Sequence, residues 1–109
     1  MDFVKQLFYH KTTDITIDIR LGFDKETLTL EDYDIGSKVE QLRGDFDYEY
    51  QLSIKEQELD KLYRLNGIEP AQKPGLMDAL SEKFNGNQVF SLFRTYLTEN
   101  EVKFDVFLY

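Results

Sequence analysis

The sequence predicts an α+β fold in which a mostly antiparallel sheet of four or five strands carries three to four helices on one face. Strand-like segments fill most of the first half of the chain, where apolar and polar residues alternate with period two. Helix-like segments, with apolar residues every three or four positions, fill most of the second half. The length of 109 residues fits one hydrophobic core. We therefore expect a single domain over residues 1–109.

Alternation with period two predicts the strands. Residues 14–23 alternate most cleanly, and Asp24-Lys25 is the expected turn of an antiparallel hairpin with residues 27–33. Residues 3–10 predict a first strand with poorer alternation, and residues 47–54 predict a further strand. One face of these strands carries Ile15, Ile17, Ile19, Leu21, Phe23, Leu28, Leu30, Tyr48, Tyr50, Leu52 and Ile54.

Apolar residues at helical spacing, together with capping residues, predict the helices. The expected helices are a short one over residues 35–43 after a cap at Asp34, one from a Ser53–Glu56 capping box to Gly67, one from Pro74 to Gly86, and one from Asn87 to Asn100. Residues 102–109 return to alternation, so they predict a C-terminal strand that enters the sheet.

Negative charge is concentrated in one segment of the chain. The formal net charge is −8, and the residues from Glu31 to Asp60 include ten acidic and three basic side chains. Seven of the eight net charges therefore lie in this segment. Such a field repels nucleic acid and attracts basic surfaces. We expect the partner to be another protein with a basic surface, and we expect no direct nucleic-acid binding.

The cellular compartment is predicted from three absences in the sequence. The chain contains no cysteine, which excludes disulfides and thiol chemistry and favours a reducing compartment. The N-terminus lacks the layout of a signal peptide, and no apolar run approaches the length that spans a bilayer. We therefore expect a cytoplasmic protein without membrane association.

Catalytic and cofactor signatures are missing from the sequence. The one histidine, His10, has no evident nucleophile beside it, so a partly exposed histidine near a turn is the expected role. There is no glycine-rich phosphate loop and no dinucleotide fingerprint. We predict no catalytic residue and no cofactor, and hence a protein that is not an enzyme.

The carboxylates that begin at Asp45 are candidate ligands for a metal ion. The spacing of Asp45, Asp47, Glu49 and Glu56 partly matches a calcium-binding loop, but Tyr50 stands where that loop requires glycine. No such calcium loop, and no other metal site, is therefore predicted. A looser cation site on the strand, or a carboxylate pair for acid–base chemistry, remains an alternative.

The expected contact surface lies within residues 31–49, where carboxylates are dense and some aromatic residues do not fit the core pattern. Tyrosine suits an interface because it supplies a large contact area at low entropic cost. The candidate partner-binding residues are Asp32, Tyr33, Asp34, Asp45, Phe46, Asp47 and Glu49. The alternative is that this stretch is only solvated surface.

The run from Asp32 to Tyr50 is similar to a pattern in small uncharacterised bacterial proteins. In them an Asp-x-Gly turn, here Asp34-Ile-Gly36, precedes a short apolar segment and an Asp-Tyr-Glu-Tyr strand, here 47–50. The likeness covers roughly residues 30–109, through a helix ending near Lys83-Phe84 to an extended aromatic C-terminus. Proteins of this size, acidity and layout resemble the immunity proteins of bacterial toxin systems.

This resemblance implies a protein that binds a cognate toxin and blocks its active site or its engagement with its target. It implies no enzymatic residues. An acidic inhibitor suits a basic nuclease toxin, because the acidic surface mimics phosphate charge and speeds association. Three other functions stay open: a phage anti-defence protein that mimics DNA, a regulatory protein-binding module, and an enzyme with convergent carboxylates.

Overall fold

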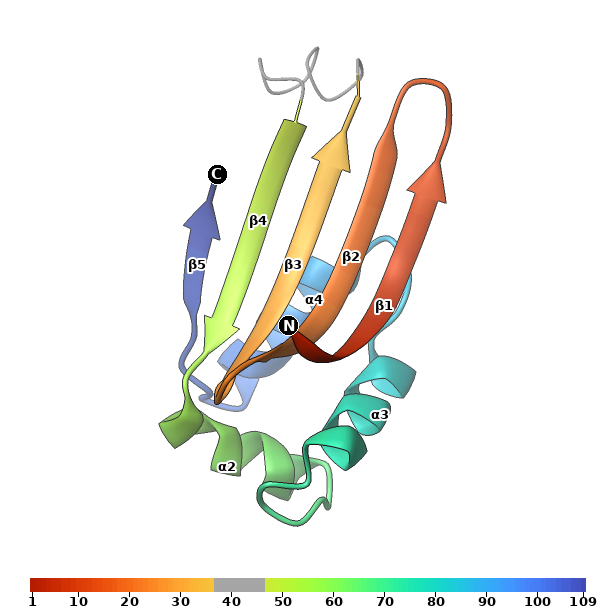
Figure 1. The fold of residues 1–109 in the computed structure, drawn as a ribbon. Helices are drawn as coiled ribbons and strands as arrows, with labels where there is room; N and C mark the ends of the chain where they lie inside the picture. The colour runs from red at the N-terminus through yellow and green to blue at the C-terminus, as the bar shows by residue number, and fades with distance from the viewer. Residues whose placement is uncertain (37–46) are drawn as a thin grey trace.

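The computed structural model describes residues 1–36 and 47–109. In these residues the chain forms one antiparallel sheet and three helices, which confirms the predicted α+β fold (Figure 1). The elements in chain order are β1 (Asp2–Lys11), β2 (Thr16–Asp24), β3 (Thr27–Ile35), β4 (Asp47–Ile54), α2 (Glu56–Leu65), α3 (Lys73–Lys83), α4 (Val89–Glu99) and β5 (Asp105–Leu108).

The five strands lie side by side in the order in which they occur in the chain. Every neighbouring pair is antiparallel, from β1 with β2 to β4 with β5. The predicted C-terminal strand does enter the sheet, although it spans only Asp105–Leu108 rather than residues 102–109. The sheet therefore has two edges, formed by β1 and β5 (Figure 1).

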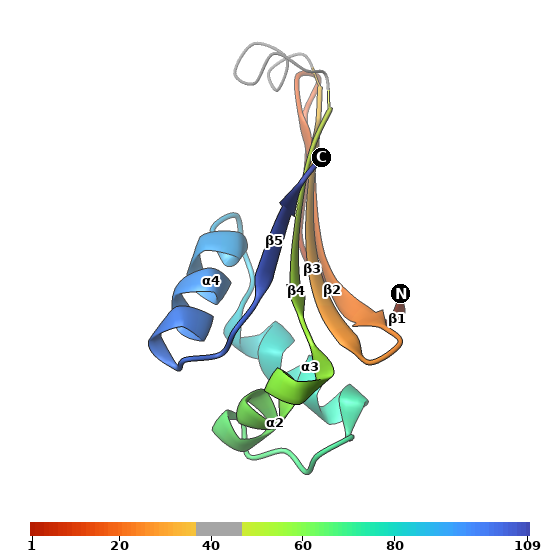
Figure 2. The ribbon, with the colours of Figure 1, turned by 90° about the vertical axis from the view of Figure 1, so that its left-hand side faces the viewer.

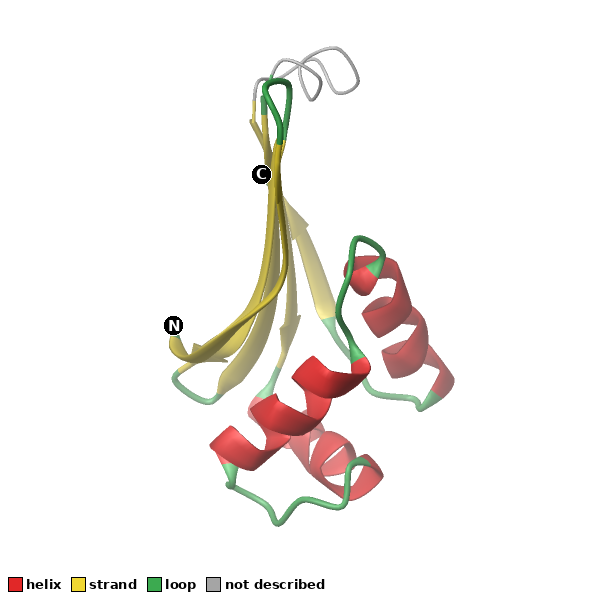
Figure 3. Ribbon diagram, turned by 90° about the vertical axis from the view of Figure 1, so that its right-hand side faces the viewer, coloured by secondary structure: helices red, strands yellow, loops and turns green. Residues whose placement is uncertain are grey.

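The three helices all lie on one side of the sheet and around one end of it, and they leave the opposite side uncovered (Figures 2 and 3). We call the covered side the helix face and the other side the open face. An antiparallel sheet tolerates this arrangement, because its alternating side chains can be apolar on one face and polar on the other.

The alternation of β2, β3 and β4 builds the core on the helix face. Leu21 pairs with Leu30, which in turn pairs with Leu52, and all three side chains are fully buried. Burying a leucine side chain of this kind stabilises the fold by roughly 1.5–3 kcal/mol. Helix residues complete the core, among them Leu62, Leu76, Met77, Leu80, Phe93 and Leu97.

The β2–β3 hairpin turn lies one residue further along the chain than predicted. Asp24 pairs with Thr27, so the two loop residues are Lys25 and Glu26. Lys25 has the left-handed backbone angle φ 56°. Lys73, at the start of α3, forms a 3.0 Å ion pair with Glu26, which attaches the turn to that helix.

Two predicted helix caps are wrong. Ser53 remains in β4, where it pairs with Thr29, and α2 begins after Lys55 without a side-chain cap. Asn87 does not cap α4, because that helix begins after Gln88, again without a side-chain hydrogen bond. Pro74 does lie in the first turn of α3, as predicted.

The predicted short helix over residues 35–43 falls mostly outside the described residues. Ile35 is the last residue of β3, where it pairs with Asp47. The beginning of the predicted helix is therefore strand.

Candidate protein-binding surface

The structure divides the predicted partner-binding residues between the two faces of the sheet. Tyr33 and Glu49 pair with each other on the open face. Asp32 and Asp34 pair with Tyr50 and Tyr48 on the helix face, since neighbouring residues of a strand point to opposite sides. Asp45 and Phe46 lie outside the described residues, and of Asp47 only its backbone position in β4 is described.

The helix-face carboxylates lie beside aromatic rings. The rings of Tyr48 and Tyr50 meet edge to face with 4.5 Å between centroids, and Tyr50 in turn lies 5.1 Å from Phe90 of α4. Asp32 and Asp34 are both half-buried here. They therefore do not share a surface with Tyr33 and Glu49.

The open face instead brings Tyr33 and Glu49 together with residues of β2. Tyr33 pairs with Asp18 on one side and with Glu49 on the other, so a tyrosine stands between two carboxylates. Next to this row, Arg20 pairs with Glu31. A shallow hollow of about 220 Å³ is lined by Asp18, Arg20, Glu31, Tyr33 and Glu49. We call these five residues the acidic hollow.

Hydrogen bonds hold two of the three carboxylates of the acidic hollow in place. Asp18 forms a 2.8 Å ion pair with Arg20 and also accepts a 3.0 Å hydrogen bond from the side-chain amide of Gln6. Glu31 accepts a 3.2 Å hydrogen bond from the side-chain amide of Gln51. These contacts span β1, β2, β3 and β4, so the sheet itself positions the charges.

Exposed aromatic side chains border the acidic hollow on both sides. Tyr9 of β1 pairs with Asp18 and is 52% exposed, and Phe107 of β5 pairs with Gln51 and is 45% exposed. The hydroxyl of Tyr109 donates a 3.3 Å hydrogen bond to Gln51. The acidic hollow and its borders thus combine three carboxylates and one guanidinium with aromatic area, which suits a cationic protein surface.

Sequence reasoning missed Asp18, Arg20 and Tyr9 as site residues. Asp18 lies outside the acidic segment from Glu31 to Asp60, and only the pairing of β2 with β3 brings it beside Tyr33. The signal for Asp18 and Arg20 was the register of the β2–β3 hairpin: with Asp24 opposite Thr27, Asp18 lies opposite Tyr33 and Arg20 opposite Glu31.

The acids of α2 lie away from the acidic hollow. Glu56, Glu58 and Asp60 belong to the helix that follows β4, at the end of the sheet remote from Asp34 and Asp47 (Figure 1). The acidic segment of the sequence is therefore not one surface in the fold.

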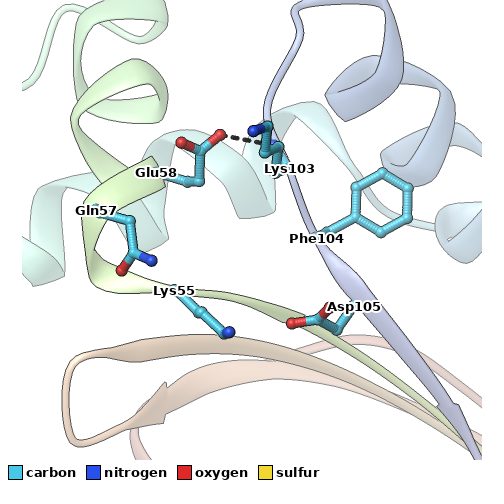
Figure 4. A pocket seen from close by; sticks show the side chains of 6 residues that line it. All are labelled: Lys55, Gln57, Glu58, Lys103, Phe104 and Asp105. Carbon is cyan, nitrogen blue, oxygen red and sulfur yellow. Dashed lines mark hydrogen bonds between the residues drawn. The ribbon is translucent and has the colours of Figure 1, made fainter.

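A second hollow, of about 260 Å³, lies where α2 begins and the chain enters β5 (Figure 4). It is lined by Lys55, Gln57, Glu58, Lys103, Phe104 and Asp105. Its central carboxylate, Glu58, already accepts hydrogen bonds from the backbone N–H of Lys103 at 2.8 Å and from the Lys61 ammonium at 3.0 Å. The hollow is therefore a junction between α2 and the segment that leads into β5. Its lining carries charges of both signs, and no reactive side chains of the described residues converge there.

Histidine and metal chemistry find little support in the described residues. The exposed ring of His10 stacks on Phe8 with 6.3 Å between centroids, at the end of β1 before the turn to β2. Within residues 1–36 and 47–109, no group of three or more metal-ligating side chains is placed to hold an ion. None of the helices in that part of the chain combines the length and apolar character that crossing a bilayer requires.

Comparison of the chain with protein-family models, with curated proteins and with solved structures gives no significant match. Its function is therefore inferred from the chemistry and position of the acidic hollow.

Proposed function

We propose that this chain is a binding protein whose open face holds a basic surface of another protein, and that it acts as an immunity-type inhibitor of a bacterial toxin. The observation that carries the proposal is the placement of Tyr33 between Asp18 and Glu49 on the side of the sheet that the helices leave uncovered.

Charge supports a basic partner. The acidic hollow holds three carboxylates and a single guanidinium, and the whole chain carries a net charge of −8. A lysine or arginine of the partner can pair with Glu49 and lie against the ring of Tyr33. Long-range attraction between the acidic chain and a basic partner also speeds their encounter.

The fixed positions of two carboxylates in the acidic hollow favour binding without rearrangement of the site. Asp18 is held by Gln6 of β1 at 3.0 Å, and Glu31 is held by Gln51 of β4 at 3.2 Å. Binding therefore orders few side chains that were free beforehand, which reduces the entropic cost of association.

The resemblance of the sequence to immunity proteins and the shape of the site support an inhibitory role. A sheet face with a shallow hollow can cover a partner's surface and exclude that partner's substrate without performing chemistry. A nuclease toxin is the most suitable partner, because the surface that binds nucleic acid phosphates is basic.

The rival DNA-mimic function draws less support from this geometry. Mimicry of a duplex needs phosphate-like carboxylates along one long face, whereas Asp32 and Asp34 point to the helix face and Glu31, Tyr33 and Glu49 to the open face. An arginine, Arg20, also interrupts the acids of the open face.

The test compares two triple variants with equal changes in charge. The first, Asp18→Asn with Glu31→Gln and Glu49→Gln, neutralises the acidic hollow. The control, Glu56→Gln with Asp60→Asn and Glu69→Gln, neutralises three exposed acids on α2 and the loop after it. Where a basic nuclease toxin is encoded beside the gene for this chain, its purified catalytic domain is the probe, and binding is measured by calorimetry.

We expect the open-face variant to bind at least about tenfold more weakly than the unchanged protein, with the control close to the unchanged protein. The affinity of the unchanged protein should also fall as salt rises from about 0.05 to 0.5 M, because screening weakens the attraction. Equal loss in both variants would mean that only net charge matters, and that result would remove the open face from the proposal.

A further inference from the structure

The two edges of the sheet are protected very differently. The pairing of β1 with β2 is irregular at two places, between Asp2 and Lys5 and between Gln6 and Phe8. Lys5 forms a 2.9 Å ion pair with Asp78 of α3, and the carbonyl of Leu7 accepts a 3.2 Å hydrogen bond from the backbone N–H of Gly86. Irregular pairing, lysines and a covering segment are the devices by which proteins keep an edge strand from pairing with another chain.

The β5 edge lacks these devices. Among the described residues no segment lies beside β5 on the side away from β4 (Figures 1 and 2). Residues 105–109 contain no lysine and no proline. Three of their side chains are strongly exposed, at 45% for Phe107, 62% for Leu108 and 68% for Tyr109.

The pairing of β5 with β4 determines which backbone groups face outward. The N–H of Tyr109 donates a 2.9 Å hydrogen bond to the carbonyl of Glu49. In an antiparallel ladder, hydrogen bonding to one neighbour uses every second residue. Asp105, Phe107 and Tyr109 therefore bond toward β4, whereas Val106 and Leu108 direct their N–H and C=O groups to the free edge.

We propose that a second copy of this chain pairs antiparallel with β5, about a two-fold axis through Phe107, and joins the two sheets into one. Val106 of each copy would then lie opposite Leu108 of the other, and each such pair exchanges two backbone hydrogen bonds. The N–H and C=O groups that β5 directs to its free edge are thus hydrogen-bonded in both copies. The contacts are the same in each copy, as a two-fold interface requires.

The side chains are self-complementary in this register. Phe107 meets Phe107 of the second copy in a pair without direct backbone hydrogen bonds, where side chains approach most closely. On the same face, Asp105 lies opposite Tyr109, so no carboxylate faces another carboxylate. On the helix face, Val106 lies against Leu108. A second copy is therefore a better occupant than an acidic or basic strand of another protein.

The interface is small, because β5 is only four residues long. We expect a reversible dimer in the micromolar range, as is typical of interfaces at the low end of the size range. An axis perpendicular to the sheet places both open faces on the same side of the dimer. The inference does not depend on the proposed function of the open face.

The absence of cysteine from the sequence allows a direct test of the register. In Phe107→Cys the two thiols would lie across the two-fold axis, with Cα atoms about 4.5 Å apart, within the range that a disulfide bridges. Mild oxidation should convert most of this variant to a covalent dimer on a non-reducing gel. The control is Tyr9→Cys, on the same face at the opposite edge and 52% exposed, which should remain largely monomeric.

A second test measures association without a cross-link. Sedimentation velocity of the unchanged chain from about 5 to 500 µM should show a shift from monomer to dimer. Leu108→Pro removes an outward N–H while leaving the bonds to β4, so it should abolish this shift without changing the circular dichroism spectrum. If that variant does not fold, Leu108→Lys serves the same purpose, because a charge at the edge opposes pairing.

Three outcomes would overturn the proposal. They are a chain that stays monomeric at the highest concentration, a dimer that survives the folded Leu108 variant, and equal cross-linking of Phe107→Cys and Tyr9→Cys.

Discussion

Glu58 in the first turn of α2 accepts a 2.8 Å hydrogen bond from the backbone N–H of Lys103, in the segment that leads into β5 (Figure 4). The same carboxylate accepts a 3.0 Å hydrogen bond from the ammonium group of Lys61. These bonds, the one from Lys103 first, lower the pKa of Glu58 because they stabilise its ionised form. The attachment of α2 to the β5 segment is therefore sensitive to pH.

Glu58→Gln should lower the melting temperature at neutral pH. It should also make the melting temperature fall less as the pH is lowered. Because folding lowers the pKa of Glu58, its contribution to stability is complete above the pKa of the unfolded chain, about 4.3, and is lost as the pH falls through the lower folded value. Thermal melts from about pH 7 to pH 3 should show the two proteins converging in acid. Glu56→Gln, in the same helical turn, is the control and keeps the bond to Lys103. A constant difference at every pH would contradict the prediction.

Tyr63→Phe should make the protein more resistant to alkali. Tyr63 is 4% exposed, and burial, followed by the negative charges of Glu26 and Asp60, raises the pKa of its phenol. The unfolded chain therefore ionises this group at a lower pH than the folded chain, so stability falls as the pH rises above about 10. Urea unfolding at about pH 9 and pH 11 should show a smaller loss of stability in the variant. An identical loss in both proteins would show that Tyr63 does not carry this effect.

Gly36→Ala should be strongly destabilising. Gly36 has φ +139°, and a Cβ atom there would clash with the carbonyl oxygen of Asp14, so the backbone before β2 would have to move. We expect a loss of more than about 2 kcal/mol in the free energy of unfolding. The control is Gly67→Ala, where φ is +65° but the new Cβ has open space around it, with no contact within 4 Å from the described residues, and the expected loss is only about 1 kcal/mol. Equal losses would mean that backbone conformation alone matters at both glycines.

Lys25→Gly should stabilise the β2–β3 hairpin. The left-handed backbone of Lys25, at φ 56°, costs a residue with a side chain about 1–2 kcal/mol, whereas glycine loses about 0.5–1 kcal/mol more entropy on folding. The expected net gain is about 0.5 kcal/mol, measured by chemical denaturation. Lys25→Ala keeps the unfavourable backbone conformation, so a gain of the same size in that variant would show that the lysine side chain is the cause.

The strands were predictable because their signal is local. Leu21 and Leu30 lie on the apolar side of an alternation that each strand shows by itself, and both are fully buried. The helix caps were not predictable from short motifs alone. Ser53 has the right spacing to cap α2, but its backbone pairs with Thr29 in the β4 ladder. Strand pairing therefore takes the place of the cap.

The candidate site was predictable only in part, because strand pairing joins residues that are distant in sequence. Tyr33 and Glu49 stood out through the local density of acids. Asp32 and Asp34 stood out for the same reason, yet the two-residue period places them on the helix face. Asp18 required knowledge of which residue of β2 lies opposite Tyr33.

The order of the strands also bears on how the chain folds. Neighbours from β1 to β3 are joined by short turns, whereas the whole of α2, α3 and α4 separates β4 from β5. Closing so long a stretch of chain costs entropy, so we expect β5 to reach its place late and its amide hydrogens to exchange early. Until then β4 is an open edge, and a β5 strand from another chain can dock there. Refolding at high protein concentration should therefore favour assemblies in which chains exchange their β5 strands. Refolding at low protein concentration should suppress these assemblies.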